Sequence, residues 1–265
     1  MRGLVDKDNR PARHRPAASV LKQSHSRVLM AIARFYAGPA PLETGPIELS
    51  AAESRHARAS RRLKPNDLVT LFDGLGCQAQ ANIIAIGGDG VTLQIDELQY
   101  RDSDAALHLE VAIALPKGPR QDILVEKCTE LGVAAIRPIK CARSIAQPSD
   151  HRLDKLRRTV IEACKQAQRT WLCDIRGPTS LEDVLHLRSE FDTAYIAAMQ
   201  GQPVAALKTS PRQKVLILIG PEGGFTDEEL LAARRAGFEP VQLAQTILRT
   251  ETAAITAAAC FLTPR

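Results

Sequence analysis

The chain has 265 residues, of which 45% are hydrophobic and 25% are charged, a composition typical of a globular protein of about two domains. No apolar run approaches the roughly 20 residues that span a bilayer, and the six cysteines form neither a C-x-x-C pair nor a Cys/His cluster at zinc spacing. These features argue against a membrane protein, a disulfide scaffold and a zinc enzyme. Since no secretory signal opens the sequence, we expect a cytoplasmic protein with reduced thiols and no bound metal.

The net charge of +5 is unevenly distributed along the chain. Residues 1–34 hold eight of the 35 basic residues and two of the 30 acidic residues, which leaves 27 basic and 28 acidic residues in the remainder. A uniformly basic body would attract nucleic acid over a long range, and this body is not basic. Any contact with RNA must therefore come from local patches or from the first segment.

Residues 1–29 contain Pro, Ser, Arg and His without an apolar period, which predicts a disordered extension. This extension is interpreted either as a nucleic-acid arm or targeting peptide, or as a segment upstream of a true start at Met30.

Residues 30–100 are predicted to form a small β-rich domain. Ser50-Ala-Ala-Glu53 is a capping box that predicts a helix to about Leu63. Strands are expected at 68–72, 78–86 and 91–98, joined by glycine-rich turns as a β-meander. The polar stretch 100–104 is a linker.

Residues 107–265 are predicted to form an α/β domain with a mostly parallel sheet, because strand and helix patterns alternate. Strands are expected at 109–115, 134–139, 193–198, 215–219 and 241–243, and helices at 120–131, 150–168, 180–188, 227–236 and 251–262. The strand Val215–Ile219 (VLILI) is apolar on both faces, as in a central strand covered on both sides.

The loop Gly220-Pro-Glu-Gly-Gly-Phe225 follows this strand and precedes a second capping box, Thr226-Asp-Glu-Glu229. Ligands of parallel sheets bind beyond the carboxyl ends of the strands, and glycines permit a close approach of the backbone. No Lys-Ser/Thr follows, so the loop is not a Walker A motif, and the acids of the first helical turn would repel a phosphate. The loop therefore favours a cationic or uncharged ligand, unless it is only a tight strand–helix turn.

A second motif, Leu243-Ala-Gln-Thr-Ile-Leu-Arg249-Thr250-Glu251-Thr-Ala253, leads into an Ala-rich helix. Thr250 is the expected helix cap. Arg249 lies between apolar residues and the helix start, which is an unusual position for a surface arginine. This position indicates either a functional role or a local ion pair.

Together, GPEGGFTDEEL (220–230) and ILRTETA (247–253) resemble the C-terminal motifs of the RsmE family, SPOUT-superfamily enzymes that methylate uridine N3 in bacterial 16S ribosomal RNA. Further stretches resemble the family in consistent order between about residues 34 and 262: Arg34-Phe-Tyr36, Leu71–Gly74, Pro116–Gly118, Val125–Val133, Arg143-Ser144, and Glu162-Ala163 with Gln166 and Arg169.

The resemblance implies a PUA-like β-barrel followed by a SPOUT α/β domain with a trefoil knot. It also implies S-adenosylmethionine as methyl donor, ribosomal RNA or the small ribosomal subunit as partner, and a homodimer with the site at the subunit interface. The donor carries a sulfonium and no phosphate, which agrees with a glycine loop beside carboxylates. The expected cofactor-binding residues are Ile219, Gly220, Glu222, Gly223, Gly224, Leu243, Ala244, Ile247, Leu248 and Thr250.

For catalysis, we expect Arg249 to stabilise the developing uracil anion, and either Glu251 or Glu222, the nearby carboxylates, to accept the N3 proton. Both acids have alternative roles, in complementing the helix dipole and in binding the cofactor or backbone. Glu162, Gln166 and Arg169 are predicted to share one helix face. The expected RNA-binding residues are Arg34, Arg61, Lys117, Lys127 and Arg169.

The chain departs from the family at Ala244 and Thr246, where L-G-x-R usually precedes I-L-R. An alanine in place of a strained glycine would cost on the order of 1 kcal/mol or require an altered loop. Two alternatives stay open, a SPOUT enzyme that methylates a ribose 2′-hydroxyl and a non-catalytic RNA-binding or ribosome-assembly protein. The sequence leaves the target nucleotide undetermined.

Overall fold

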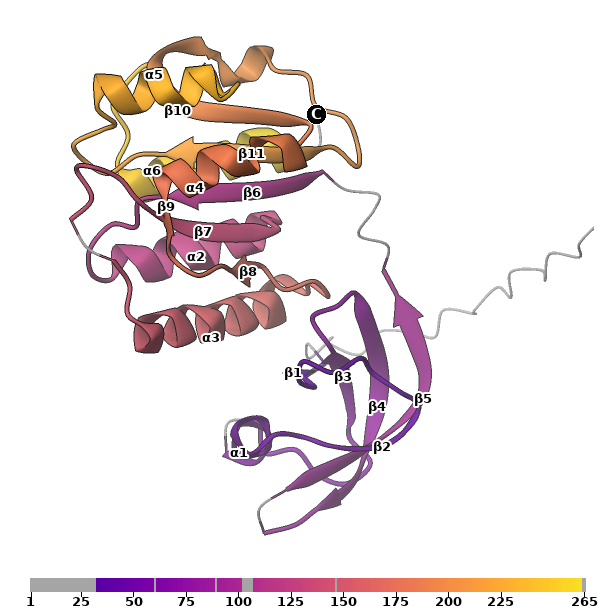
Figure 1. The fold of residues 1–265 in the computed structure, drawn as a ribbon. Helices are drawn as coiled ribbons and strands as arrows, with labels where there is room; N and C mark the ends of the chain where they lie inside the picture. Colours follow the sequence, from indigo (N-terminus) through magenta and orange to yellow (C-terminus); the bar gives the residue numbers. More distant parts are fainter. Residues whose placement is uncertain (1–31, 60, 89, 102–106, 146, 264–265) are drawn as a thin grey trace, which may run out of the picture. The chain divides into compact units, whose positions relative to one another are not determined.

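The computed structural model describes residues 32–59, 61–88, 90–101, 107–145 and 147–263 (Figure 1). The predicted extension 1–29 lies outside the described residues. Within the described ranges, no helix is both long enough and apolar enough to cross a membrane.

The first domain contains a five-stranded sheet in the order β1-β3-β4-β5-β2. Strand β1 pairs with β3 in parallel, and the other pairs are antiparallel. Alternate residues face the core; in β3, for example, Val69 and Leu71 are fully buried. The elements are β1 (Arg34–Tyr36), β2 (Gly45–Glu48), α1 (Ala51–Ala59), β3 (Leu68–Phe72), β4 (Cys77–Ile86) and β5 (Val91–Tyr100).

The predicted meander β3–β4–β5 is confirmed, whereas the helix predicted to reach Leu63 ends at Ala59. Arg62 then adopts a left-handed backbone with φ of 50°, a conformation that does not continue a helix.

The second domain is built on a parallel sheet in the order β12-β10-β11-β6-β7-β8, with β9 pairing to β7. Its strands are β6 (His108–Ile113), β7 (Ala135–Lys140), β8 (Asp174–Ile175), β9 (Thr179–Ser180), β10 (Thr193–Pro203), β11 (Lys214–Ile219) and β12 (Glu239–Gln242). The predicted α/β alternation is confirmed, and VLILI is a central strand flanked by β10 and β6.

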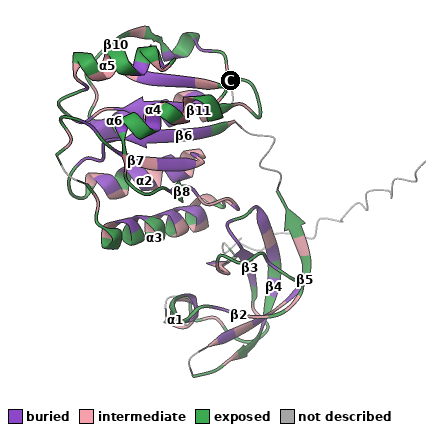
Figure 2. Ribbon diagram, in the orientation of Figure 1, coloured by how far each residue is buried: buried purple, intermediate pink, exposed green. Residues whose placement is uncertain are grey.

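Helices cover both faces of this sheet (Figure 1). Val111 and Ile217 pack with α2 (Arg120–Leu131), α3 (Asp150–Ala167) and α6 (Thr250–Leu262) on one face. Ala112 and Leu218, on the opposite face, pack with α4 (Leu181–His186) and α5 (Asp227–Arg235). Figure 2 shows the resulting burial of β6 and β11.

The turn between β3 and β4 contacts the segment that follows α3. The Gly76 N–H donates to the Thr170 carbonyl at 3.1 Å, and the Leu172 N–H donates to the Gly74 carbonyl at 3.0 Å. Gly76 has a φ of +101°, and a Cβ there would overlap the indole ring of Trp171. Both the backbone conformation and the close approach therefore require glycine at position 76.

Candidate active site

A cavity of about 370 Å³ opens where β10, β11 and β12 end. This position, at the carboxyl edge of the parallel sheet, is where ligands of such folds bind. The two motifs singled out in the sequence meet here, because the cavity lining contains Ile219, Gly220, Glu222, Gly223, Gly224, Leu243, Ala244, Ile247, Leu248 and Thr250. All ten residues expected to bind the cofactor thus line the same cavity, although they come from two separate segments of the chain.

The loop after β11 is held in a fixed conformation by its neighbours. The Gly224 N–H donates to the Pro221 carbonyl at 2.8 Å, and Gly224 has a left-handed φ of +69°. The predicted capping box of α5 is confirmed, since Thr226 and Glu229 exchange backbone and side-chain hydrogen bonds. Arg143 reaches across from the loop after β7 and donates to the Gly223 carbonyl at 2.7 Å.

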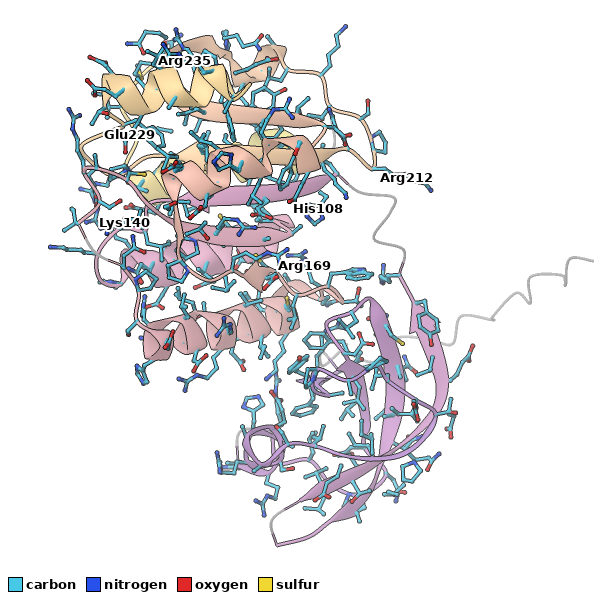
Figure 3. All side chains as sticks on the ribbon, in the orientation of Figure 1. His108, Lys140, Arg169, Arg212, Glu229 and Arg235 are labelled. Carbon is cyan, nitrogen blue, oxygen red and sulfur yellow. The ribbon has the colours of Figure 1, made fainter. Side chains whose placement is uncertain are left out.

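Glu229 also links these two loops (Figure 3). One of its carboxylate oxygens accepts from the Thr226 N–H at 2.8 Å, and the other accepts from the Ala142 N–H at 2.7 Å. A single side chain thus caps α5 and joins the loop after β7 to the start of α5.

The second loop differs from the sequence prediction at its helix start. Arg249, with an extended backbone, is the N-cap residue of α6 and makes no side-chain capping bond. Thr250 is already helical and buried, and its hydroxyl donates to the Gly220 carbonyl at 3.5 Å. The prediction that Thr250 caps the helix is therefore wrong; this residue instead lies against the glycine loop.

Ala244 fits its position without left-handed strain, because it is absent from the non-glycine residues of positive φ among those described. The strain expected from an alanine at this position is not present. The loop accommodates a Cβ in an ordinary backbone conformation.

The cavity has a further wall that the sequence did not reveal. Ala197, Ala198, Met199 and Gln200, in the second half of β10, also line it. The strand was expected to end at 198 but continues to Pro203, and these residues carry no pattern that distinguishes a ligand-facing position from an ordinary strand.

Of the candidate catalytic residues, Glu222 lines the cavity, whereas Arg249 and Glu251 do not and are the chain neighbours of the lining residue Thr250. The Arg249 side chain is exposed and has no hydrogen bond or ion pair with any described residue, so the local ion pair considered for it is not formed. Glu251 is buried, with 8% of its surface exposed, in the first turn of α6. Glu222 lies on the opposite loop, and both carboxylates are paired with Arg120.

Of the five candidate RNA-binding residues, Arg34 and Arg169 contact each other. Arg61 and Lys117 are exposed on different domains. Lys127 pairs with Glu126 and Glu130, which raises its pKa above the ordinary value.

Arg34 and Arg169 are held by protein partners. Arg34 donates to Gln78 at 3.0 Å and to the Arg169 carbonyl at 2.8 Å, and its burial lowers its pKa. Arg169 was predicted to share a face of the preceding helix, but α3 ends at Ala167 and Gln168 is left-handed (Figure 3). Its guanidinium instead donates to the carbonyls of Thr129, Gly132 and Val133 at the end of α2.

The described residues contain no group of three His, Cys, Asp or Glu side chains able to hold a metal ion. All six cysteines are free thiols. Burial raises the pKa of Cys128 and Cys141 to about 12, so these thiols stay protonated near neutral pH.

Comparisons with known proteins agree with this arrangement of domains. A family model described as an RNA methyltransferase domain matches residues 103–262, and one described as an RNA methyltransferase PUA domain matches residues 49–96. The chain is 32% identical to the ribosomal RNA small subunit methyltransferase E of Synechocystis, over 88% of this chain and 78% of that protein. The chain belongs to the small-subunit ribosomal RNA methyltransferase E family. It therefore joins a PUA-like domain to a SPOUT methyltransferase domain, the architecture predicted from the sequence.

Solved structures of relatives contain the predicted cofactor. The methyltransferase E of Neisseria gonorrhoeae, bound to S-adenosylmethionine, is 30% identical and superposes with a TM-score of 0.79, covering 86% of this chain and 95% of that one. A Legionella pneumophila protein in complex with bound S-adenosylmethionine is 28% identical, with a TM-score of 0.80 over 88% of this chain and 97% of that one. The trefoil knot that the family resemblance implies stays a prediction.

Proposed function

We propose that this protein transfers a methyl group from S-adenosylmethionine to N3 of a uridine in small-subunit ribosomal RNA. The observation that carries the proposal is the convergence of residues 219–224 and 243–250 on one cavity in a chain whose family relatives bind this cofactor. The cavity volume of about 370 Å³ lies within the range of small-molecule sites.

The chemistry of the lining suits this cofactor better than a nucleotide phosphate. Backbone groups of the glycine loop and the apolar side chains of Leu243 and Leu248 can hold an adenosine. The first turn of α5 carries Asp227, Glu228 and Glu229, whose negative charges disfavour a phosphate and are compatible with a sulfonium.

S-adenosylmethionine supplies an electrophilic methyl group when it is bound, and the chain must then hold the uridine and remove its N3 proton. Arg249 is available for this task, because its guanidinium has no described protein partner and lies at the N-terminus of α6. A fixed cation beside the uracil stabilises negative charge as the proton leaves. Glu251 follows in the first turn of the same helix and is the proposed proton acceptor.

The proposal includes a homodimer in which a second copy covers the mouth of the cavity. Ile247, which lines the cavity, is 87% exposed, an unusual exposure for a large apolar side chain beside a ligand site. A partner subunit would remove this side chain from water.

RNA contact is proposed at the exposed side chains of Arg61 and Lys117, while the engagement of Arg34 and Arg169 with protein carbonyls favours a structural role for those two. We expect the protein to act in the cytoplasm, where ribosomal subunits are assembled.

Nucleoside mass spectrometry tests the proposal. Small ribosomal subunits lacking the modification are incubated with the protein and isotope-labelled S-adenosylmethionine, then digested to nucleosides. Labelled 3-methyluridine is the expected product. A labelled ribose 2′-hydroxyl would instead support a SPOUT enzyme that methylates ribose. If the protein is folded and binds the cofactor but no nucleoside is labelled, the result would support a non-catalytic RNA-binding role.

A further inference from the structure

Arg120 connects three elements that meet at the edge of the cavity. It is the first residue of α2, and its Nη2 lies 3.3 Å from Glu222 Oε1 on the loop after β11. Its Nη1 lies 3.8 Å from Glu251 Oε2 in the first turn of α6. One guanidinium therefore joins a carboxylate of the cavity lining to the carboxylate proposed to accept the proton.

The contact between Arg120 and Glu251 is an ion pair without a hydrogen bond. A distance of 3.8 Å is an ion pair but exceeds a hydrogen bond, so the lone pairs of this oxygen are not used by Arg120. Oε2 is buried and has no hydrogen-bond partner among the described residues. A buried carboxylate oxygen without a donor is costly unless a cation compensates its charge or a ligand supplies a proton. Arg120 provides the charge and leaves the oxygen free to receive the proton.

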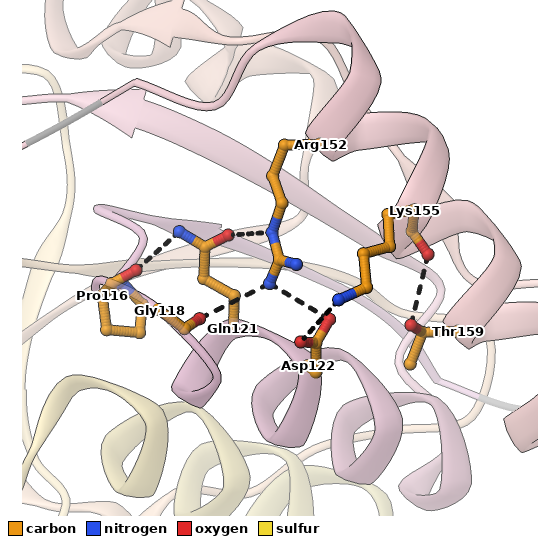
Figure 4. A network of polar contacts seen from close by, with 7 residues as sticks. All are labelled: Pro116, Gly118, Gln121, Asp122, Arg152, Lys155 and Thr159. Atoms are coloured by element: carbon orange, nitrogen blue, oxygen red, sulfur yellow. Dashed lines mark hydrogen bonds and ion pairs between the residues drawn. The ribbon is translucent and has the colours of Figure 1, made fainter.

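The start of α2 is itself held by a network of polar side chains (Figure 4). The N-cap residue of the helix, Pro119, makes no side-chain capping bond. Instead, Gln121 donates from Nε2 to the Pro116 carbonyl at 2.6 Å and accepts from Arg152 Nε at 2.6 Å. Arg152 also pairs with Asp122 at 3.1 Å.

This network fixes the helix end from which Arg120 projects. Gln121 is buried, and its two short hydrogen bonds join the turn before α2 to α3. The backbone from which the Arg120 side chain projects is thus held by contacts of neighbouring residues.

We propose that Arg120 is a positioning residue for methyl transfer, which holds the Glu222 and Glu251 carboxylates at fixed places relative to each other. The inference rests on the proposed function. In the step that it serves, the uridine N3–H bond breaks and the proton passes to Glu251 Oε2, while the N3–CH₃ bond forms and the S–CH₃ bond breaks. The sulfonium becomes a neutral thioether and the carboxylate a neutral acid, so the charges balance.

A lysine at position 120 cannot fully replace the pairing of the arginine with two carboxylates. Guanidinium presents two nitrogens in a planar fork, which here serve two carboxylates on different elements, whereas an ammonium is a single point charge. Arg120→Lys is therefore expected to retain more activity than Arg120→Ala but less than the unchanged protein.

The test measures single-turnover methyl transfer at saturating cofactor and saturating ribosomal subunits. Arg120→Ala is expected to slow the step by about 100-fold, the size of effect that follows a misplacement of catalytic groups by about 1 Å. Arg235→Ala, on the last turn of α5, is the matched control and is expected to stay within about twofold (Figure 3). Full activity of Arg120→Ala would overturn the proposal.

A double-mutant cycle separates positioning from a general structural role. If Arg120 acts through Glu251, Arg120→Ala adds less than about threefold to the loss already caused by Glu251→Gln, because the two residues act as a unit. A full 100-fold additional loss would show that Arg120 acts independently of that carboxylate and would contradict the inference.

A crystal structure of Arg120→Ala gives a readout that does not need the reaction. Displaced side chains of Glu222 and Glu251 are expected, and unmoved carboxylates would contradict positioning. If the unchanged protein transferred no methyl group, the proposed function would fail, while this structure would still decide the role of Arg120.

Discussion

The cavity and the junction between the two domains use arginine in opposite ways. At the junction, the guanidinium groups of Arg34 and Arg169 donate to backbone carbonyls, and Arg34 also lies 4.6 Å from the centre of the Phe72 ring. At the cavity, Arg249 is exposed and donates to no described residue. An arginine whose donors are already used stabilises the fold, whereas one with free donors beside a cavity can bind a substrate.

The two regions also differ in how they use glycine. Gly76 at the junction allows the indole of Trp171 to pack against the backbone, while Gly224 at the cavity has a left-handed backbone with open space around its Cβ position. Substitutions in the two regions should therefore separate stability from activity.

The largest effect is expected at the cavity. Arg249→Ala should lower the rate of methyl transfer by about 10²–10³-fold, the cost typical of removing a group that stabilises an oxyanion. The free energy of unfolding and the oligomeric mass should stay unchanged, because the side chain has no described partner to lose. Nearly full activity with Arg249→Ala would contradict its assigned role.

At the junction, Gly76→Ala should lower the free energy of unfolding by about 2–3 kcal/mol, since it combines a left-handed backbone with an overlap onto Trp171. Gly88→Ala is the matched control, because nothing lies within 4 Å of its Cβ position, and should change stability by less than about 0.5 kcal/mol. Urea unfolding measures both. Equal stabilities for the two variants would contradict the packing described for Gly76.

Arg169→Ala should lower the free energy of unfolding by about 1.5–3 kcal/mol, because it removes charge-assisted hydrogen bonds to three carbonyls at the end of α2. Arg158→Ala, on the exposed side of α3, should have little effect. If Arg169→Ala instead kept its stability and lost affinity for ribosomal subunits, the residue would belong to the RNA-binding surface.

The smallest effect is expected from Ala244→Gly, which restores the residue usual in the family. Since Ala244 has no left-handed strain to relieve, glycine should leave cofactor affinity within about twofold and lower stability by about 0.5–1 kcal/mol. Calorimetric titration with S-adenosylmethionine measures the cofactor affinity of both proteins. A tenfold gain in affinity would mean that the alanine Cβ obstructs the cavity.

Much of the fold could be predicted from the sequence because its elements have strong local patterns. The apolar run VLILI is the central strand β11, and the helix predicted at 120–131 has those bounds in the structure. Strands β1, β2, β8 and β9 were missed, since two to four residues are too short to show a period.

The site was predictable where its chemistry lies in contiguous loops. Residues 220–224 follow β11 and residues 243–250 follow β12, the two strands that flank β10 in the parallel sheet, so the topology brings the two segments to the same edge. The contacts of Arg120 and Arg169 could not be predicted, because their partners lie about 40 to 130 residues away in the chain. The left-handed Gln168 also ends α3 without a glycine to signal it.

A crystal structure of the protein with S-adenosylmethionine would show whether the two loops bind the cofactor and present its methyl group to the proposed catalytic side chains. We expect the cofactor in the cavity between residues 219–224 and 243–248, with its methyl group facing Arg249 and Glu251. Cofactor bound elsewhere, or a methyl group directed away from these two side chains, would contradict it.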